Sequence, residues 1–410
     1  MHNILFALCL CFTLTLSAQR NHLISFEKVD SYSKETLQEL WADNSVPEFI
    51  SPVNYGVEVY EVLYWTKWHD GSKIKASGYY WLPIDKRSDL PFACYNHGSR
   101  SKRAHKVDLG GEQLITTALA ADGYAVIMPD YIGLGKGDKF HLYMHAESEA
   151  YASIDMIRAV REMNVEIEIE LNEYLFLSGY SQGGHAAMAT HKMMQEKYPD
   201  EFNVTASAPM SGAYDLAGVQ RINMFEPYTR PAYLAYLIQS YNEVYGFYDD
   251  VRNVFKHEFG DTVISMLESQ KYTLSRISKV LPVVPAEALT EEVVKMYVED
   301  PDAGIGMALK VNSNHDWAPE NPMMICYCKS DEEVSYLNAK VAHENMKDKG
   351  SKHIRLRHAG KKFDHRSCAL YTSIYTKMYF DSFLKGSKKG RKGPVTKRFL
   401  ISLGKIGAKP

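Results

Sequence analysis

One serine has neighbours suited to nucleophilic chemistry. Ser181 stands in Gly179-Tyr180-Ser181-Gln182-Gly183, after an apolar run at residues 174–178 and before a helical pattern at residues 184–198. A serine on a tight strand-to-helix turn projects its hydroxyl, and glycines two residues away on each side give the turn room. The pattern predicts a nucleophile elbow, with Ser181 as the nucleophile.

A serine nucleophile needs a histidine base and a carboxylate that orients the histidine. Asp331 follows an apolar run at residues 323–327, and His365 follows another at residues 353–357 after a loop. Both therefore come from the carboxyl ends of predicted strands, where sites in such sheets form. Glu332 and Glu333 compete with Asp331. His353 and His358 compete with His365, but we expect them within the strand itself.

Ester or amide cleavage also requires two N–H donors that stabilise an oxyanion. Gln182, the residue after the nucleophile, supplies one donor by its position. The sequence Tyr95-Asn96-His97-Gly98-Ser99 follows the run at residues 91–96, and its glycine allows close backbone approach. We expect Ser99 or Gly98 to provide the second donor.

Three other patterns predict neither a cofactor nor a metal. Gly133-Leu134-Gly135-Lys136-Gly137 lacks the spacing of a nucleotide-binding loop. His141 and His145 have helical spacing but no third ligand, and Cys326 and Cys328 would face one side of a strand. The predicted chemistry needs no cofactor.

The elements that must position these residues follow from apolar periodicity. The chain has 410 residues, 45% hydrophobic, with a formal net charge of -3, which excludes a disordered or fibrous protein. Short apolar runs alternate with helical patterns, which is typical of a mostly parallel sheet covered by helices. We expect eight strands. The first two form an antiparallel hairpin at the sheet edge, and the strands lie at residues 57–68, 73–82, 91–96, 125–129, 174–178, 204–208, 323–327 and 353–357.

Three segments fall outside this alternating pattern. Residues 211–322 contain no credible buried strand and many aromatic side chains, which predicts an inserted helical cap. We expect most of these aromatic side chains to form the core of the cap and a few to line a pocket. Residues 1–18 resemble a signal peptide, so we expect export to the periplasm or outside the cell. Residues 385–410 carry basic residues without any acid, and we expect a solvated tail or weak contact with an anionic surface.

Two cysteines flank the predicted acid and base. Cys328 lies three residues before Asp331, and Cys368 lies three residues after His365. Since the acid and base must meet, we hypothesise a Cys328–Cys368 disulfide, which an oxidising compartment would permit.

With the elbow, acid, histidine and HG loop in order, the chain resembles the α/β-hydrolase superfamily, and within it the secretory lipase family of lipase A-like enzymes. The resemblance covers most of residues 55–384 and rests also on Pro129-Asp130-Tyr131-x-Gly133-x-Gly135. It implies core segments at residues 19–210 and 323–384, a lid over the site, and acyl-ester substrates. Gly184-His185 departs from the small residues that family members often have.

Three functions remain open at this point. The first is a carboxylic ester hydrolase, acting on a lipid, aryl or carbohydrate ester. A peptidase of the same fold would need acidic side chains for the substrate's amine, and the candidates are Glu226, Asp249, Asp250 and Glu299. The third is a binding protein on a hydrolase scaffold, which filled catalytic positions disfavour. We expect neither a nucleic-acid partner nor a transmembrane segment in the mature chain.

Overall fold

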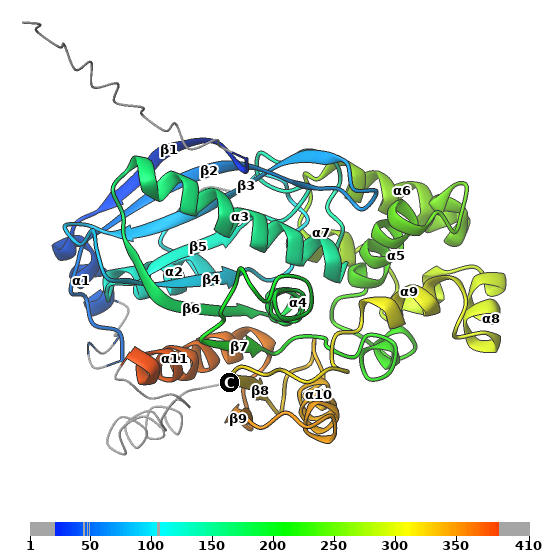
Figure 1. Ribbon diagram of the computed structural model, residues 1–410. Helices are drawn as coiled ribbons and strands as arrows, with labels where there is room; N and C mark the ends of the chain where they lie inside the picture. The colour runs from blue at the N-terminus through cyan, green and yellow to red at the C-terminus, as the bar shows by residue number, and fades with distance from the viewer. Residues whose placement is uncertain (1–20, 44–45, 47, 49, 105–106, 385–410) are drawn as a thin grey trace, which may run out of the picture.

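A single mixed sheet forms the centre of the protein (Figure 1). The computed structural model describes residues 21–43, 46, 48, 50–104 and 107–384, so the predicted signal peptide and basic tail lie outside the described residues. The nine strands run in the order β1-β2-β3-β5-β4-β6-β7-β8-β9. They are β1 (Leu23–Tyr32), β2 (Val57–Lys67), β3 (Lys73–Pro83), β4 (Leu90–Asn96), β5 (Ala125–Pro129), β6 (Leu171–Tyr180), β7 (Ala206–Met210), β8 (Met323–Cys328) and β9 (Ile354–Gly360).

The sheet has one strand more than the eight expected. β1 pairs antiparallel with β2, so the predicted β2–β3 hairpin is present but β2 is not at the edge. The sequence of β1 hides it, because Glu27, Lys28 and Asp30 interrupt any apolar run, and only one of its ten residues is buried. β3 pairs antiparallel with β5, and every pairing from β5 to β9 is parallel.

Helices cover both faces of the sheet. Side chains of α1 (Lys34–Asp43), α2 (Gly111–Ala121) and α11 (His365–Leu384) pack against one face. The other face is covered by α3 (Ala146–Glu166), α4 (Gln182–Lys197) and α10 (Leu337–Asp348). Alternating residues of β8 point to the two faces. Met324 and Cys326 pack on the face covered by α1, α2 and α11, and Met323 and Ile325 pack on the opposite face.

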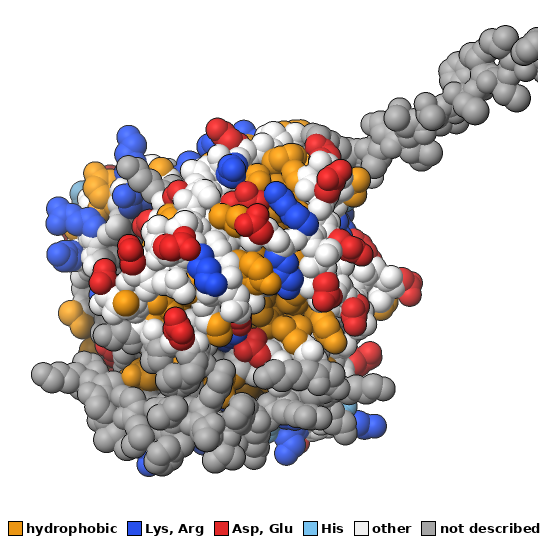
Figure 2. All heavy atoms as spheres, turned by 90° about the vertical axis from the view of Figure 1, so that its left-hand side faces the viewer, with side chains coloured by type: hydrophobic (Ala, Val, Ile, Leu, Met, Phe, Trp, Pro, Cys, Tyr) orange, Lys and Arg blue, Asp and Glu red, His pale blue; other side chains and the backbone are white. Residues whose placement is uncertain are grey.

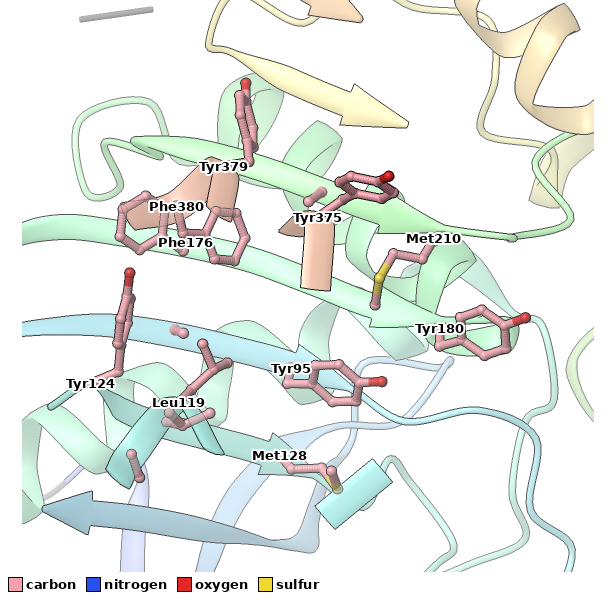
Figure 3. Close-up of a cluster of buried hydrophobic side chains, with 14 of the residues drawn as sticks. Tyr95, Leu119, Tyr124, Met128, Phe176, Tyr180, Met210, Tyr375, Tyr379 and Phe380 are labelled. Atoms are coloured by element: carbon pink, nitrogen blue, oxygen red, sulfur yellow. The ribbon is translucent and has the colours of Figure 1, made fainter. Parts of the chain in front are cut away.

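Buried aromatic side chains on the face covered by α1, α2 and α11 hold α11 against β6, the strand that leads to Ser181. In Figure 3, Phe176 of β6 lies beside Phe380 of α11, and their ring centroids are 4.5 Å apart. Tyr180 lies farther along the same strand, near its carboxyl end (Figure 3). Burial of these aromatic rings stabilises the position of a helix whose first residue is His365.

A helical insertion at residues 211–322, all described, joins β7 to β8. Apart from the isolated bridge between Phe255 and Leu289, it contains helices and turns. Figure 1 shows α5, α6, α8 and α9 gathered at one end of the sheet. Its elements are η1 (Gln220–Met224), α5 (Ala232–Tyr245), η2 (Val251–Val254), α6 (His257–Ser269), α7 (Leu274–Ser278), η3 (Pro285–Ala288), α8 (Glu291–Glu299) and α9 (Gly304–Asn312).

The insertion has its own apolar core. Most of that core comes from residues 213–309, including Tyr236, Tyr241 and Phe255, while Tyr143, Met144 and Val334 join it from the sheet domain. The aromatic residues of the insertion thus mainly form its own core. At the opposite end of the molecule, Figure 2 shows acidic and basic side chains interspersed. No helix among the described residues is long and apolar enough to cross a membrane.

Candidate active site

Ser181 lies at a sharp turn between β6 and α4. Its backbone has φ 59° and ψ -120°, which a residue with a side chain rarely adopts and which tertiary packing must enforce. The turn passes so close to β4 that a Cβ added to Gly183 would lie 1.8 Å from the Asn96 carbonyl oxygen. The predicted strand–turn–helix geometry of Gly179, Tyr180, Ser181 and Gly183 is therefore present.

The structure brings Ser181, His365 and Asp331 together. His365 Nε2 lies 2.9 Å from Ser181 Oγ, and His365 Nδ1 lies 2.8 Å and 2.9 Å from the two carboxylate oxygens of Asp331. Because a carboxylate only accepts, Nδ1 carries the proton and Nε2 presents its lone pair to the serine hydroxyl. Ser181 and His365 are both buried.

Three consecutive carboxylates surround His365. Besides Asp331, Glu332 accepts a hydrogen bond from the His365 backbone N–H at 2.8 Å, and Glu333 Oε2 lies 3.9 Å from Nε2. Burial lowers the pKa of His365, but the hydrogen bond and charge of Asp331, with the charges of Glu333 and Glu332, outweigh burial and leave this pKa raised. The two glutamates that competed with Asp331 in the sequence thus contact His365 at other positions.

The oxyanion candidates differ in what they contact. The Gly98 N–H donates to both carboxylate oxygens of Glu112, at 3.0 Å and 2.9 Å, so this donor is already engaged. Ser99 is the candidate that remains, and its hydroxyl lies 2.9 Å from the hydroxyl of Tyr143. Gln182 is the first residue of α4, where a backbone N–H has no partner within the helix.

A buried polar network lies behind Gln182. Its side-chain Nε2 donates to Glu149 Oε1 at 2.8 Å and to His141 Nε2 at 2.9 Å. Glu149 Oε2 lies 2.7 Å from His185 Nδ1, and His185 Nε2 lies 2.8 Å from the Asn312 carbonyl oxygen. The network anchors the residue that follows Ser181 to α3, α4 and the helical insertion.

The histidines that stood out in the sequence have structural roles in or beside this network. His141 faces the Ile132 carbonyl oxygen through Nδ1 at 2.9 Å, and burial lowers its pKa to about 4, so it is a neutral structural histidine. His145 caps α3 rather than sharing a helical face with His141. His185, the departure from family composition, is the partner of Glu149, a residue that belongs to no sequence motif.

A pocket opens beside Ser181, and the empty space in it and at its mouth, open solvent included, is about 650 Å³. Its wall is mostly apolar, and Tyr228 and Tyr233 are the aromatic side chains of residues 211–322 that line it. Among the described residues that line it, Arg221 is the charged one. The other lining residues are Tyr143, Met144, Ser181, Gln182, Ala213, Leu216, Gln220, Asn223, Met224, Leu234, Leu237, Pro285, Leu309 and Val334.

The hypothesised disulfide is present. Cys328 at the end of β8 is bonded to Cys368 in α11, so a covalent bridge joins the strand before Asp331 to the helix that begins with His365. Cys326 and Cys94 are buried thiols. No cluster of three metal-ligating His, Cys, Asp or Glu side chains occurs among the residues with described positions.

Comparisons with known proteins give a consistent picture. The family model for secretory lipases matches residues 99–371, whereas no curated protein matches the chain. A crystal structure of the rice cell wall degrading esterase LipA from Xanthomonas oryzae is 26% identical, with a TM-score of 0.79, covering 91% of this chain and 100% of the esterase. A protein from Legionella pneumophila is 25% identical, with a TM-score of 0.80, covering 88% of this chain and 98% of its own.

A more distant structure shares the fold. Lipase A from Candida antarctica, in its closed state, is 14% identical, with a TM-score of 0.67, covering 91% of this chain and 84% of the lipase. The nine-stranded, mostly parallel sheet flanked by helices is that of an α/β hydrolase. With two thirds of its length matched by the family model, the chain belongs to the secretory lipase family, whose members are hydrolases of the lipase and esterase type.

Proposed function

We propose that this protein is a serine hydrolase that cleaves carboxylic esters through an acyl-enzyme. Ser181 is the nucleophile, His365 the base and Asp331 the acid that orients the base. The observation that carries the proposal is the unbroken chain of contacts from Ser181 Oγ through His365 to Asp331, at 2.9 Å and 2.8 Å.

Each step of the reaction has a group to perform it. Ser181 Oγ attacks the ester carbonyl carbon while its proton passes to His365 Nε2, and Asp331 stabilises the imidazolium through Nδ1–H. The backbone N–H groups of Gln182 and Ser99 receive the negative charge on the carbonyl oxygen. His365 then protonates the departing alcohol, and water attacks the acyl-enzyme by the same route. The cycle needs no cofactor.

The pocket favours an acyl or aryl group over a charged one. Leu216, Leu234 and Leu237 contribute apolar wall, and burying such surface contributes about 25 cal/mol per Å². We propose that the helical insertion acts as the cap over this pocket. The peptidase alternative loses support, because Glu226, Asp249, Asp250 and Glu299 are exposed and none lines the pocket.

We also propose that the protein is exported. The Cys328–Cys368 bridge suits an oxidising compartment, and the matching family is named for secretion. The N-terminal and C-terminal segments on which the signal-peptide and anionic-surface hypotheses rest lie outside the described residues.

The decisive experiment compares wild-type protein with Ser181→Ala on p-nitrophenyl esters of increasing acyl length and on aminoacyl anilides. We expect ester hydrolysis whose kcat falls roughly 10⁴-fold or more in the variant. Ser275→Ala, an exposed serine of α7, is the matched control and should keep wild-type rates. Turnover of anilides alone would favour a peptidase, and silence on both substrate sets without fluorophosphonate labelling would favour a binding protein.

A further inference from the structure

Glu333 is a buried carboxylate that the proposed reaction does not use. It lies in the loop between β8 and α10, two residues after Asp331, and is 5% exposed. Its Oε1 accepts a hydrogen bond from Arg230 Nε at 2.7 Å, and its Oε2 accepts one from the Tyr233 hydroxyl at 2.8 Å. The same Oε2 lies 3.9 Å from His365 Nε2.

The backbone of Glu333 is held by the same part of the helical insertion. Its carbonyl oxygen accepts hydrogen bonds from Tyr228 Oη at 2.7 Å, Gln220 Nε2 at 2.9 Å and Asn223 Nδ2 at 3.3 Å. All five side-chain donors to Glu333 therefore come from residues 220–233. Glu333 thus attaches the insertion to the loop that carries Asp331, next to Val334, which packs into the insertion's apolar core.

Glu333 differs from the other charged groups near His365 in the ring nitrogen that it faces. Asp331 faces Nδ1, and Glu332 contacts the backbone N–H. Glu333 faces Nε2, the atom to which the proton of Ser181 passes. Other titratable or charged groups around the ring are Glu112 from α2, Tyr180 from β6, Asp364 and Arg366 beside His365, and Arg230 and Tyr233 from the insertion.

We propose that Glu333 is a positioning residue for His365 and that Arg230 balances its charge, so that the helical insertion adjusts the electrostatic environment of the base. The inference rests on the proposed function, because it assigns His365 the role of base. A carboxylate within about 4 Å favours the imidazolium, whereas a guanidinium on the far side of that carboxylate opposes it. The two side chains therefore act in opposite directions.

Opposite charges predict opposite changes in the pH profile. The acid limb of kcat/KM reports loss of the neutral base in the free enzyme. Glu333→Gln removes a negative charge, so the pKa of His365 falls and the midpoint of the limb moves to lower pH, by roughly one unit. Arg230→Gln leaves the carboxylate uncompensated, so the midpoint moves to higher pH. The double variant should lie between the two single variants.

The test is the pH dependence of ester hydrolysis for wild-type, both single variants and the double variant, with p-nitrophenyl esters as substrate. Glu299→Gln and Arg276→Gln are matched controls, since both are exposed side chains of the insertion, and they should leave the midpoint unchanged. Circular dichroism checks that each variant is folded. If Arg230→Gln fails to fold, Glu333→Gln decides the matter alone, because the amide oxygen can still accept from Arg230 while the amide NH2 donates to the Tyr233 hydroxyl.

The outcomes separate this inference from the proposed function. An active wild-type enzyme whose midpoint is the same in Glu333→Gln would overturn the inference, even if kcat or thermal stability fell, because a purely structural role would leave the midpoint in place. A wild-type protein without ester hydrolysis would instead refute the function on which the inference rests. Should Glu333→Gln be too slow to assay, the pH dependence of its labelling by a fluorophosphonate gives the same midpoint.

Discussion

Two carboxylate–histidine pairs lie near Ser181, with nearly equal contact distances. Asp331 and His365 are 2.8 Å apart, and Glu149 and His185 are 2.7 Å apart. The pairs differ in the group that the second ring nitrogen of the histidine faces. His365 Nε2 faces the Ser181 hydroxyl, whereas His185 Nε2 faces the Asn312 carbonyl oxygen, which can only accept a hydrogen bond. A histidine beside a carboxylate acts as a base only where its other nitrogen has a lone pair to offer.

The largest expected difference between the pairs concerns catalysis. Asp331→Asn keeps the size of the side chain but no longer fixes the proton on His365 Nδ1, so we expect kcat to fall roughly 10⁴-fold. Hydrolysis of the best p-nitrophenyl ester measures it. A loss smaller than tenfold would show that Glu332 or Glu333 can orient the base and would weaken the assignment of Asp331.

The second prediction concerns stability. His185→Ala leaves the Glu149 carboxylate buried without its histidine partner, since Glu149 is 1% exposed. Removing a hydrogen-bond partner from a buried carboxylate in this way costs about 1–3 kcal/mol of unfolding free energy. Urea unfolding measures it, with His343→Ala, a partly exposed histidine of α10, as the control. An unchanged midpoint would mean that the pair contributes nothing to the fold.

The smallest effect should come from replacing the carboxylate of the Glu149–His185 pair by an amide. In Glu149→Gln, the new amide oxygen can accept from Gln182, and its nitrogen can donate to Nδ1 of a neutral His185. Every hydrogen bond is then preserved, so we expect a loss of about 1 kcal/mol or less and a kcat close to that of wild type. A large loss of kcat here, matching that of Asp331→Asn, would make the two pairs equivalent and contradict the comparison.

The sequence predicted the site best where the signal is local. The elbow around Ser181 is contiguous, and its glycines are needed because β4 passes within contact distance. Asp331 and His365 were predicted from the order of strands. The Cys328–Cys368 bridge was a hypothesis, based on the acid and the base having to meet, and the structure contains it. These inferences needed no knowledge of how distant helices pack.

Features that depend on packing between distant segments were beyond the sequence. The Gly98 N–H is engaged by Glu112, which belongs to the next helix, and we therefore proposed Ser99 as the second donor. β1 was missed because an edge strand with one solvated face has no apolar run. Glu149 lies on a helix with no motif, and its role exists because α3 and α4 bring it beside Gln182 and His185.

The contact between Ser181 and His365 joins residues 184 positions apart in the chain. During synthesis the nucleophile elbow emerges long before the helix that begins with His365, and contacts this distant in sequence form late because they close a long loop. A nascent chain that still lacks α11 has its serine but no base. On the proposed function, the chain therefore gains esterase activity only after all nine strands have been made and α11 has packed against the sheet.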